Sequence, residues 1–332
     1  MGLQDTPPLV SAVIPTRNRP ELVCRAVRSA LSQTYPNIEV VVVIDGVDPA
    51  TSAALETIQD SRLRVVPLEE SFGGSQARNI GVREARGEWI GLLDDDDEWL
   101  PTKIEKQMAV AAKIPRGNVL VVTQYFKRSE THEVVQPGRF PRPHQHISEY
   151  LFCEVPLLRW RETFLSTSTW LLRRQFLLDV PFDASVRMND DTDWLLQAIH
   201  DTDAQLYLIH EPLAIYYSES NRPRMGTDPR EFEKGIKSRN WAVRRQALFT
   251  RKALSYYFVT DCLPLAVKGR LGIKVYAGLL ADCWHYGSMT LGVLWFYFRA
   301  VILFPIVYAC TNRSMMVFLQ RILTRGRIKG RA

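Results

Sequence analysis

The sequence predicts an α/β fold in which a mostly parallel sheet carries helices on both faces, with a helical region after it. Two observations predict this class. Short apolar runs alternate with helix-like amphipathic segments along the first third of the chain, and strands joined through helices lie parallel. The run from Ile38 to Ile44 is almost wholly apolar and β-branched, which is typical of a strand covered on both faces.

The expected elements alternate in order. Leu9–Pro15 is an apolar run ended by proline, and Pro20 opens a helix whose apolar residues recur on one face. Residues 128–161 show no clear period and are expected to form a hairpin and loops. The remaining expected elements are strands at 38–44, 63–66, 88–93, 118–126 and 205–217, and helices at 76–85, 101–112 and 194–199.

Charge divides the chain into two parts. From Arg222 onward there are 20 Lys and Arg against 5 Asp and Glu, whereas residues 1–221 hold 22 basic and 31 acidic residues. With the Pro- and Gly-containing stretch that starts at Asn221, this predicts domains at 1–222 and 223–332. The rear part combines basic with aromatic and apolar residues, which favours an anionic membrane surface as partner and not a nucleic acid.

Thr290 to Ala309 is apolar enough to suggest a membrane span, but Arg299 lies at its centre, where a charge is costly. We therefore expect peripheral or monotopic association; a true span and a buried helix bundle in a soluble oligomer are the alternatives. No apolar run precedes Pro7 and the five cysteines are scattered. Both features predict a cytoplasmic protein, on the inner face of the plasma membrane.

The run Asp94–Asp97 carries the strongest chemical signal, because it directly follows an expected buried strand. Adjacent carboxylates repel one another unless a cation or solvent intervenes. Hard divalent ions such as Mg²⁺ or Mn²⁺ take one or two carboxylates together with substrate phosphates. A solvated acidic loop ahead of a helix is the alternative, but the position at a strand end favours a metal site.

Five segments follow one another along the chain: 10–20, 32–46, 73–81, 85–101 with the aspartate run, and 189–195. In sequence and order they resemble the family 2 glycosyltransferases of the GT-A fold, which transfer sugars from nucleoside diphosphates with inversion. The resemblance covers about the first 220 residues and does not extend to the last third of the chain.

The resemblance implies a nucleotide pocket. Asp45 corresponds to the aspartate that binds the base, usually uracil, although it also fits a plain Asp-Gly turn after a strand. The chain has Val47 where the family often has serine, and a single aspartate where it often has two. Pro15 and Arg17 correspond to residues that line the pocket. Arg78 corresponds to a basic residue near the donor, and its other interpretation is a helix-face arginine.

The resemblance also assigns the acidic residues. Asp94 and Asp96 correspond to the outer members of the DxD motif, with Asp96 as the direct ligand of Mn²⁺ or Mg²⁺ and Asp95 close to the ribose. Asp191, in a pair where the family usually has Glu-Asp, corresponds to the general base. Sequence alone would make Asp191 a helix N-cap, and the two roles are compatible. Asp193 is the second choice as base.

Three further side chains have two interpretations each. His210 follows a strand-like run and is either an additional metal ligand or a structural histidine. Trp170 and Trp194 are either a platform for the acceptor or core aromatics.

The predicted activity is the inverting transfer of a sugar from a nucleotide-sugar donor, a UDP-sugar, to a hydroxyl of a glycan or glycolipid acceptor, lipid-linked or part of the cell envelope. A polyprenyl-phosphate sugar synthase is the first alternative, since the hydrophobic rear part would suit its substrate. A nucleotidyltransferase is a further alternative, but it would be expected to carry a Gly-rich loop with a lysine near the N-terminus, and Pro15 to Pro20 is not such a loop. The last alternative is a non-catalytic membrane scaffold with a relic nucleotide pocket.

Overall fold

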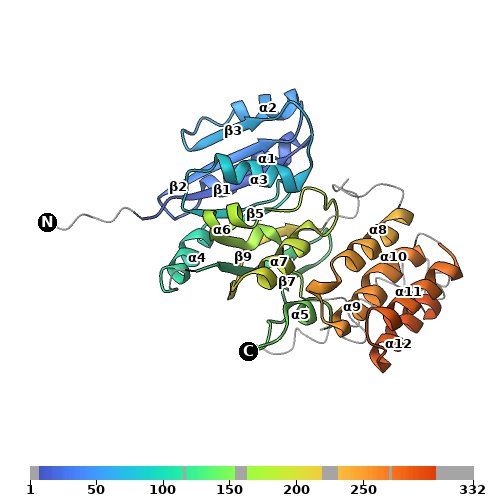
Figure 1. The fold of residues 1–332 in the computed structure, drawn as a ribbon. Coiled ribbons are helices and arrows are strands. Elements are labelled where there is room, and N and C mark those ends of the chain that lie inside the picture. The colour runs from blue at the N-terminus through green and yellow to red at the C-terminus, as the bar shows by residue number, and fades with distance from the viewer. Residues whose placement is uncertain (1–6, 115–116, 154–162, 219–230, 269–270, 304–332) are drawn as a thin grey trace. The chain divides into compact units, whose positions relative to one another are not determined.

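The computed structural model describes residues 7–114, 117–153, 163–218, 231–268 and 271–303. The chain divides into two compact units, Met1–Gly226 and Thr227–Ala332, each considered by itself (Figure 1). The domain boundary predicted at residue 222 lies outside the described residues.

The first unit contains a nine-stranded sheet with the order β3-β2-β1-β4-β8-β6-β9-β5, and β7 pairs with β6 outside this path. The four strands β3, β2, β1 and β4 are mutually parallel. The strands are β1 Val10–Thr16, β2 Ile38–Ile44, β3 Leu63–Pro67, β4 Trp89–Leu92, β5 Glu98–Trp99, β6 Val119–Arg128, β7 Glu133–Gln136, β8 Trp170–Arg173 and β9 Gln205–Tyr217.

The helices of this unit are α1 Pro20–Leu31, α2 Pro49–Glu56, α3 Gly74–Glu84, α4 Lys103–Ala111, α5 Ile147–Cys153, α6 Arg174–Asp179 and α7 Asp190–Asp201, with a short 3₁₀ turn η1 Thr167–Thr169. The predicted helices on both faces of the sheet are confirmed. The apolar face of α1 belongs to the same buried cluster as Ala12 and Ile14 of β1. On the other face, Gly81 of α3 packs its Cα against the side chains of Val13 and Val43.

The sheet becomes mixed beyond β4. Strand β8 is antiparallel to both β4 and β6, β9 is parallel to β6, and β5 is antiparallel to β9. The predicted parallel arrangement therefore holds for the first four strands. The sequence did not predict β8 because it is four residues long, and three of them are fully buried. A strand this short shows no alternation of apolar and polar residues.

The stretch 128–161 contains the predicted hairpin and one unpredicted helix. Strands β6 and β7 pair antiparallel, from Tyr125 opposite Gln136 to Arg128 opposite Glu133. Helix α5 follows, and residues 154–162 lie outside the described part. The pairing of β6 with β9 shifts in register after Thr123, and His210 lies in this irregularity.

The second unit is helical, as predicted. It contains α8 Glu231–Arg244, α9 Arg251–Tyr257, α10 Leu263–Lys268, α11 Ile273–His285 and α12 Leu291–Phe298, with a 3₁₀ turn η2 Gln246–Leu248 and two short π-helical segments, η3 Phe258–Cys262 and η4 Arg299–Leu303. Trp241 packs against Tyr257, with ring centroids 5.3 Å apart, and both side chains are buried.

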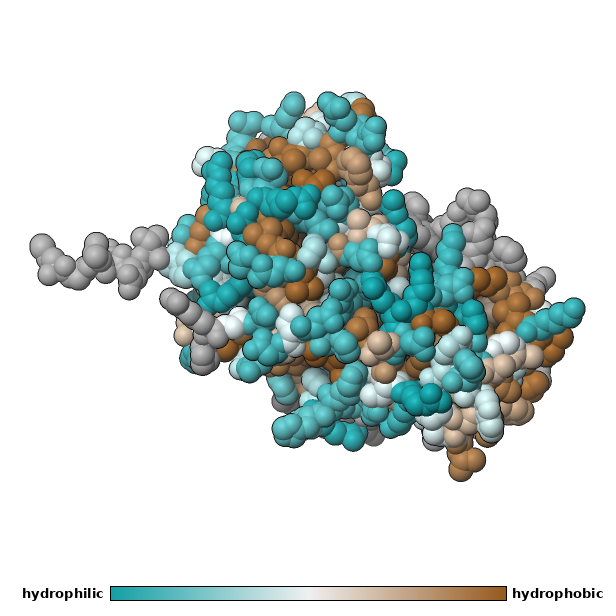
Figure 2. All heavy atoms as spheres, in the orientation of Figure 1, coloured by the Kyte–Doolittle hydropathy of each residue, from teal (hydrophilic) through white to brown (hydrophobic). Residues whose placement is uncertain are grey.

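Several large apolar side chains of this unit are exposed. Trp284 is 77% exposed and Leu291 is 86% exposed, and Figure 2 shows apolar surface over part of the unit. Of the segment Thr290–Ala309, the structure describes residues up to 303, which form α12 and η4. Within the described parts of the chain, none of the helices combines the length and the apolarity needed to cross a membrane.

Candidate active site

A cavity of about 440 Å³ opens at the carboxyl ends of β1 and β4. This is where ligands bind in parallel α/β sheets. Its walls come from the end of β1 and the loop after it, the start of α3, the acidic run after β4, the segment 184–190 that leads into α7, and Tyr216 of β9. Segments far apart in the sequence therefore meet at one cavity.

Six of the eight predicted site residues line this cavity: Pro15, Arg17, Arg78, Asp94, Asp95 and Asp96. The other two, Asp45 and Asp191, do not contribute to its lining.

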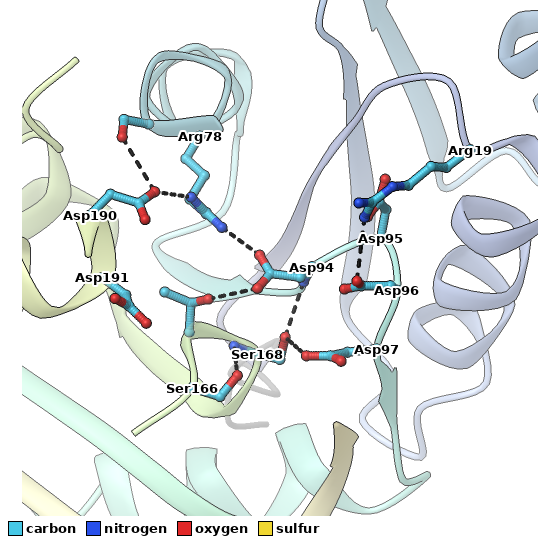
Figure 3. A network of polar contacts seen from close by, with 12 residues as sticks. Arg19, Arg78, Asp94, Asp95, Asp96, Asp97, Ser166, Ser168, Asp190 and Asp191 are labelled. Atoms are coloured by element: carbon cyan, nitrogen blue, oxygen red, sulfur yellow. Dashed lines mark hydrogen bonds and ion pairs between the residues drawn. The ribbon is translucent and has the colours of Figure 1, made fainter. Parts of the chain in front are cut away.

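Arg78 joins the two acidic clusters (Figure 3). Its Nη2 donates to Asp94 at 2.5 Å and its Nη1 donates to Asp190 at 2.8 Å. Burial disfavours the charge on this side chain, but the two carboxylates outweigh burial and raise the pKa of Arg78. Because α3 packs tightly on the sheet through Gly81, the guanidinium is held in a fixed position between Asp94 and Asp190.

Asp95 and Asp96 share a second arginine, Arg19, which sequence analysis missed. Its Nη1 lies 2.8 Å from Asp95 Oδ1 and 3.3 Å from Asp96 Oδ2. Thr16 also donates to Asp95, at 2.8 Å. Burial raises the pKa of Asp95 to about 6 in spite of Arg19. The side chain of Asp95 is 8% exposed and that of Asp96 is 21% exposed, so Asp96 is the more accessible carboxylate.

Asp97 points away from this pair (Figure 3). It is 1% exposed and accepts a hydrogen bond from Ser168 at 2.6 Å. Burial raises its pKa well above the ordinary carboxyl range. Ser168 also accepts a hydrogen bond from the backbone N–H of Asp94, at 3.1 Å. Asp97 and Ser168 therefore fix the backbone of the acidic run and do not face the cavity.

Asp45 lies behind the cavity wall. Its carboxylate accepts hydrogen bonds from Ser71 Oγ at 2.8 Å and from the backbone N–H groups of Phe72 at 2.7 Å and Gly73 at 3.0 Å. It is 2% exposed. The geometry therefore makes Asp45 a support of the loop before α3, and its contact with a nucleotide base stays a prediction.

Asp190 and Asp191 begin α7, after Asn189 in the left-handed backbone region with φ 62°. Asp190 accepts from Arg78 and, at 3.3 Å, from Ser75. Asp191 Oδ1 accepts from the backbone N–H of Thr192 at 2.6 Å. The expectation that Asp191 is the N-cap is wrong, because the N-cap is Asn189 and Asp191 is the second residue of α7. Its bond nevertheless uses one of the N–H groups at the helix start that have no partner within the helix.

The carboxylate of Asp191 lies on the side of α7 that faces Asp94 (Figure 3). Burial, together with the charge of Asp190, raises its pKa to about 7. A carboxyl group with such a pKa exchanges a proton near neutral pH, as a general base must. Asp193, the second choice, is 1% exposed and does not line the cavity.

The three side chains with two interpretations are structural. Trp170 and Trp194 are 0% and 2% exposed, with ring centroids 5.3 Å apart, so neither forms an accessible platform. His210 stacks on Phe140, with centroids 3.7 Å apart, and does not line the cavity.

The acidic run suits a divalent cation. The described residues contain no group of three or more His, Cys, Asp or Glu side chains arranged to hold a metal ion. A site completed by substrate phosphates needs only one or two carboxylates. The carboxylates of Asp95 and Asp96 already hold a positive group between them, the guanidinium of Arg19. These carboxylate oxygens therefore fit Mn²⁺ or Mg²⁺ as ligands.

Four further cavity residues had no predicted role, namely Thr16, Ser75, Arg187 and Tyr216. Ser75 lies within the segment 73–81 and Arg187 lies two residues before the segment 189–195, so membership of these segments, or nearness to them, was the available signal. Tyr216 comes from the end of a long strand and carries no local pattern that marks it as a site residue.

Comparison with known proteins agrees with this geometry. The family described as Glycosyl transferase family 2 matches residues 11–180, about half of the chain. The succinoglycan biosynthesis protein ExoO of Rhizobium meliloti is 31% identical over 201 residues, which cover 59% of this chain and 57% of that protein.

Two further similar proteins are a relative whose name includes UDP-Glc and a solved structure with a similar fold. The UDP-Glc:alpha-D-GlcNAc-diphosphoundecaprenol beta-1,3-glucosyltransferase WfaP of Escherichia coli is 38% identical over 100 residues, which cover 30% of this chain and 40% of that protein. The crystal structure of S. aureus TarS 1-349 in complex with UDP-GlcNAc superimposes with a TM-score of 0.54 and 17% identity, covering 87% of this chain and 89% of that one. The TarS likeness shows the GT-A fold, and the family match shows that this chain belongs to glycosyltransferase family 2.

Proposed function

We propose that this chain transfers a sugar from a nucleoside diphosphate donor, a UDP-sugar, to an acceptor hydroxyl with inversion at the anomeric carbon. The observation that carries the proposal is the convergence of Asp94–Asp96, Arg78 and Asp190 on one cavity at the carboxyl edge of the parallel strands. Two related proteins, WfaP and TarS, are described with UDP-Glc and UDP-GlcNAc, which supports a UDP-sugar as donor.

The nucleotide would enter along the β1 side of the cavity. Pro15 and Arg17 line this side, and Arg17 donates to Ser71 at 2.5 Å. Ser71 is in turn bound to Asp45. The Asp45 oxygens accept hydrogen bonds from Ser71, Phe72 and Gly73. Through Ser71 and Arg17, Asp45 would still shape the pocket for the base.

Asp96 would hold the metal, with Asp95 beside the ribose. Asp96 is the more exposed of the two. A bound divalent cation supplies positive charge that offsets the charge growing on the leaving diphosphate. Arg19 would then release Asp96 while keeping its shorter contact to Asp95.

Asp191 would act as the general base. It would accept the proton of the acceptor hydroxyl as that oxygen attacks the anomeric carbon from the face opposite to the diphosphate. Its bond from the Thr192 N–H holds the carboxylate at the helix start. Arg78 would keep Asp94 and Asp190 in place across the donor sugar. Positioning of this kind supplies much of the rate gain in a two-substrate transfer.

The acceptor we propose is a lipid-linked or cell-envelope glycan at a membrane surface. ExoO and WfaP are described with succinoglycan biosynthesis and a diphosphoundecaprenol acceptor. The exposed Trp284 and Leu291 and the basic excess after Arg222 suit an anionic surface. Sedimentation with phosphatidylglycerol vesicles should remove the protein from solution, and vesicles of phosphatidylcholine alone should not. Equal recovery in both supernatants would contradict this contact.

The experiment that tests the activity is UDP release from UDP-sugars, measured with Mn²⁺ and with EDTA. We expect slow hydrolysis that requires the metal and accelerates with lipid-linked sugar acceptors. Acceleration by polyprenyl phosphate instead would identify a polyprenyl-phosphate sugar synthase. If no UDP is released under any condition although UDP binds, the chain is a non-catalytic scaffold and the proposal fails.

A further inference from the structure

Arg187 differs from the other arginines that line the cavity. Arg19 and Arg78 are each ion-paired with two aspartates, and Arg17 donates to Ser71. Within the part of the chain that the structure describes, Arg187 has neither a hydrogen bond nor an ion pair. Its charge is therefore not neutralised by the protein, although it lines the same cavity.

The Arg187 side chain is exposed, and the structure places its guanidinium on the cavity wall. It lies against Gly73, where any Cβ would collide with its Nη1. Gly73 has φ 91°, a conformation that side chains rarely adopt, and its N–H is bound by Asp45. Glycine at this position therefore leaves room for the arginine on the cavity wall.

Arg187 lies three residues before Asp190, and the carbonyl of its neighbour Val186 accepts a hydrogen bond from Ser75, which also donates to Asp190. From Asp94, the contacts run through Arg78 to Asp190 and then to Ser75, two residues after Gly73. Figure 3 shows Asp190 on one side of Asp94, and Asp96 with Arg19 on the other. The proposed function requires the diphosphate at Asp96 and the donor sugar between Asp94 and Asp190. The sugar is then the substrate group on the Asp190 side, where Arg187 lies.

An arginine with no partner in a substrate cavity favours an anionic group, and a guanidinium matches a carboxylate with two parallel hydrogen bonds. We propose that Arg187 binds the carboxylate of an acidic sugar substrate, a uronic acid. This inference rests on the proposed function and deepens it. The carboxylate belongs either to the donor sugar or to the acceptor.

The donor is tested by calorimetric titration of UDP-glucuronate and UDP-glucose in the presence of Mn²⁺. We expect the wild-type protein to bind the glucuronate roughly tenfold to a hundredfold more tightly, the range for a hydrogen bond to a charged group. Arg187→Ala should remove this preference and leave UDP-glucose binding unchanged. Arg83→Ala, an exposed arginine on α3 that does not line the cavity, is the matched control and should keep the preference.

The acceptor is tested with methyl β-glucuronide and methyl β-glucoside, each titrated into protein saturated with UDP and Mn²⁺. A preference for the glucuronide that Arg187→Ala removes would assign the carboxylate to the acceptor. The inference is overturned if neither pair shows a preference for the acid. It is also overturned if Arg187→Ala leaves a preference for the acid intact. Equal weakening of the binding of both UDP-sugars by Arg187→Ala would indicate a contact with the diphosphate and would likewise overturn it.

Binding of UDP alone separates this inference from the proposed function. If the wild-type protein does not bind UDP with Mn²⁺, the proposed function itself fails. If the wild-type and Arg187→Ala proteins bind UDP equally well, the nucleotide pocket is intact in both, and the sugar titrations decide the inference.

Discussion

The acidic residues on the two sides of Arg78 are held in different ways. On the side of the parallel strands, Asp45 and Asp95 are buried, and each carboxylate accepts at least two hydrogen bonds from the protein. On the side of α7, Asp190 is bound by Arg78 and Ser75, and the one bond found for Asp191 within the described chain comes from its own helix start. The strand side thus fixes the backbone around the cavity, whereas on the helix side Asp191 is the carboxylate that the proposed function requires for proton transfer.

The largest expected effect concerns the helix side. Asp191→Asn should lower turnover by roughly 10²–10⁴-fold, because the amide cannot accept the proton of the acceptor. Nucleotide binding should stay close to that of the wild type, since the amide oxygen can still accept from the Thr192 N–H. Turnover is measured as UDP release with acceptor present, and UDP binding by calorimetry.

Asp201→Asn is the matched control, because Asp201 is an exposed aspartate at the other end of α7. It should leave turnover unchanged. Near-wild-type turnover of the Asp191→Asn protein would remove the distinction between the two sides.

The next effect concerns the link between the sides. Arg78→Met should lower the free energy of unfolding by about 3 kcal/mol, because it leaves Asp94 and Asp190 without their shared cation. This is the lower end of the usual range, since the two side chains are 27% and 29% exposed. Urea denaturation measures the change. Arg83→Met on the exposed face of the same helix should cost little, and an equal loss in both variants would show that Arg78 is not a special link.

A smaller effect concerns pH. If Asp191 is the base, kcat/KM should fall about tenfold for each pH unit below its pKa of about 7, because only the ionised form accepts a proton. The same shift means that the folded state keeps a proton that the unfolded chain has already released. The contribution of Asp191 to the free energy of unfolding is therefore fully present below about pH 4, and it is lost as the pH rises through about 7.

Rate measurements from pH 5.5 to 8.5 check this prediction. A profile that stays flat between pH 5.5 and 7.5 would assign the base to another group. Asp201→Asn should retain the wild-type profile.

Much of the strand side could be predicted from sequence, because its signals are local. The apolar runs of β1 and β2 and the acidic run after β4 each lie within a few residues, and the structure brings Pro15, Arg17 and Asp94–Asp96 together as expected. The resemblance to family 2 added Arg78. The fold class followed from the same alternation of runs.

The other parts of the site depend on contacts between residues that are far apart in the sequence. Ser168 reaches the acidic run from a short 3₁₀ turn more than seventy residues away, and Tyr216 reaches the cavity from β9. Neither position has a periodicity of its own. Burial decided between the interpretations of Trp170 and Trp194, which are core residues. His210 is exposed, and its stacking on Phe140 outside the cavity separates it from the acidic residues.

Titration of UDP into the protein with and without Mn²⁺ tests the central claim most directly, namely that Asp96 holds a divalent cation between the acidic run and a diphosphate. The wild-type protein should bind UDP at least about tenfold more tightly with Mn²⁺, a difference of about 1.4 kcal/mol. Asp96→Ala should abolish that gain, while Asp203→Ala, which removes an exposed aspartate outside the cavity, should preserve it. A gain from Mn²⁺ that is equal in the wild-type and Asp96→Ala proteins, or the absence of any gain in the wild type, would contradict the claim.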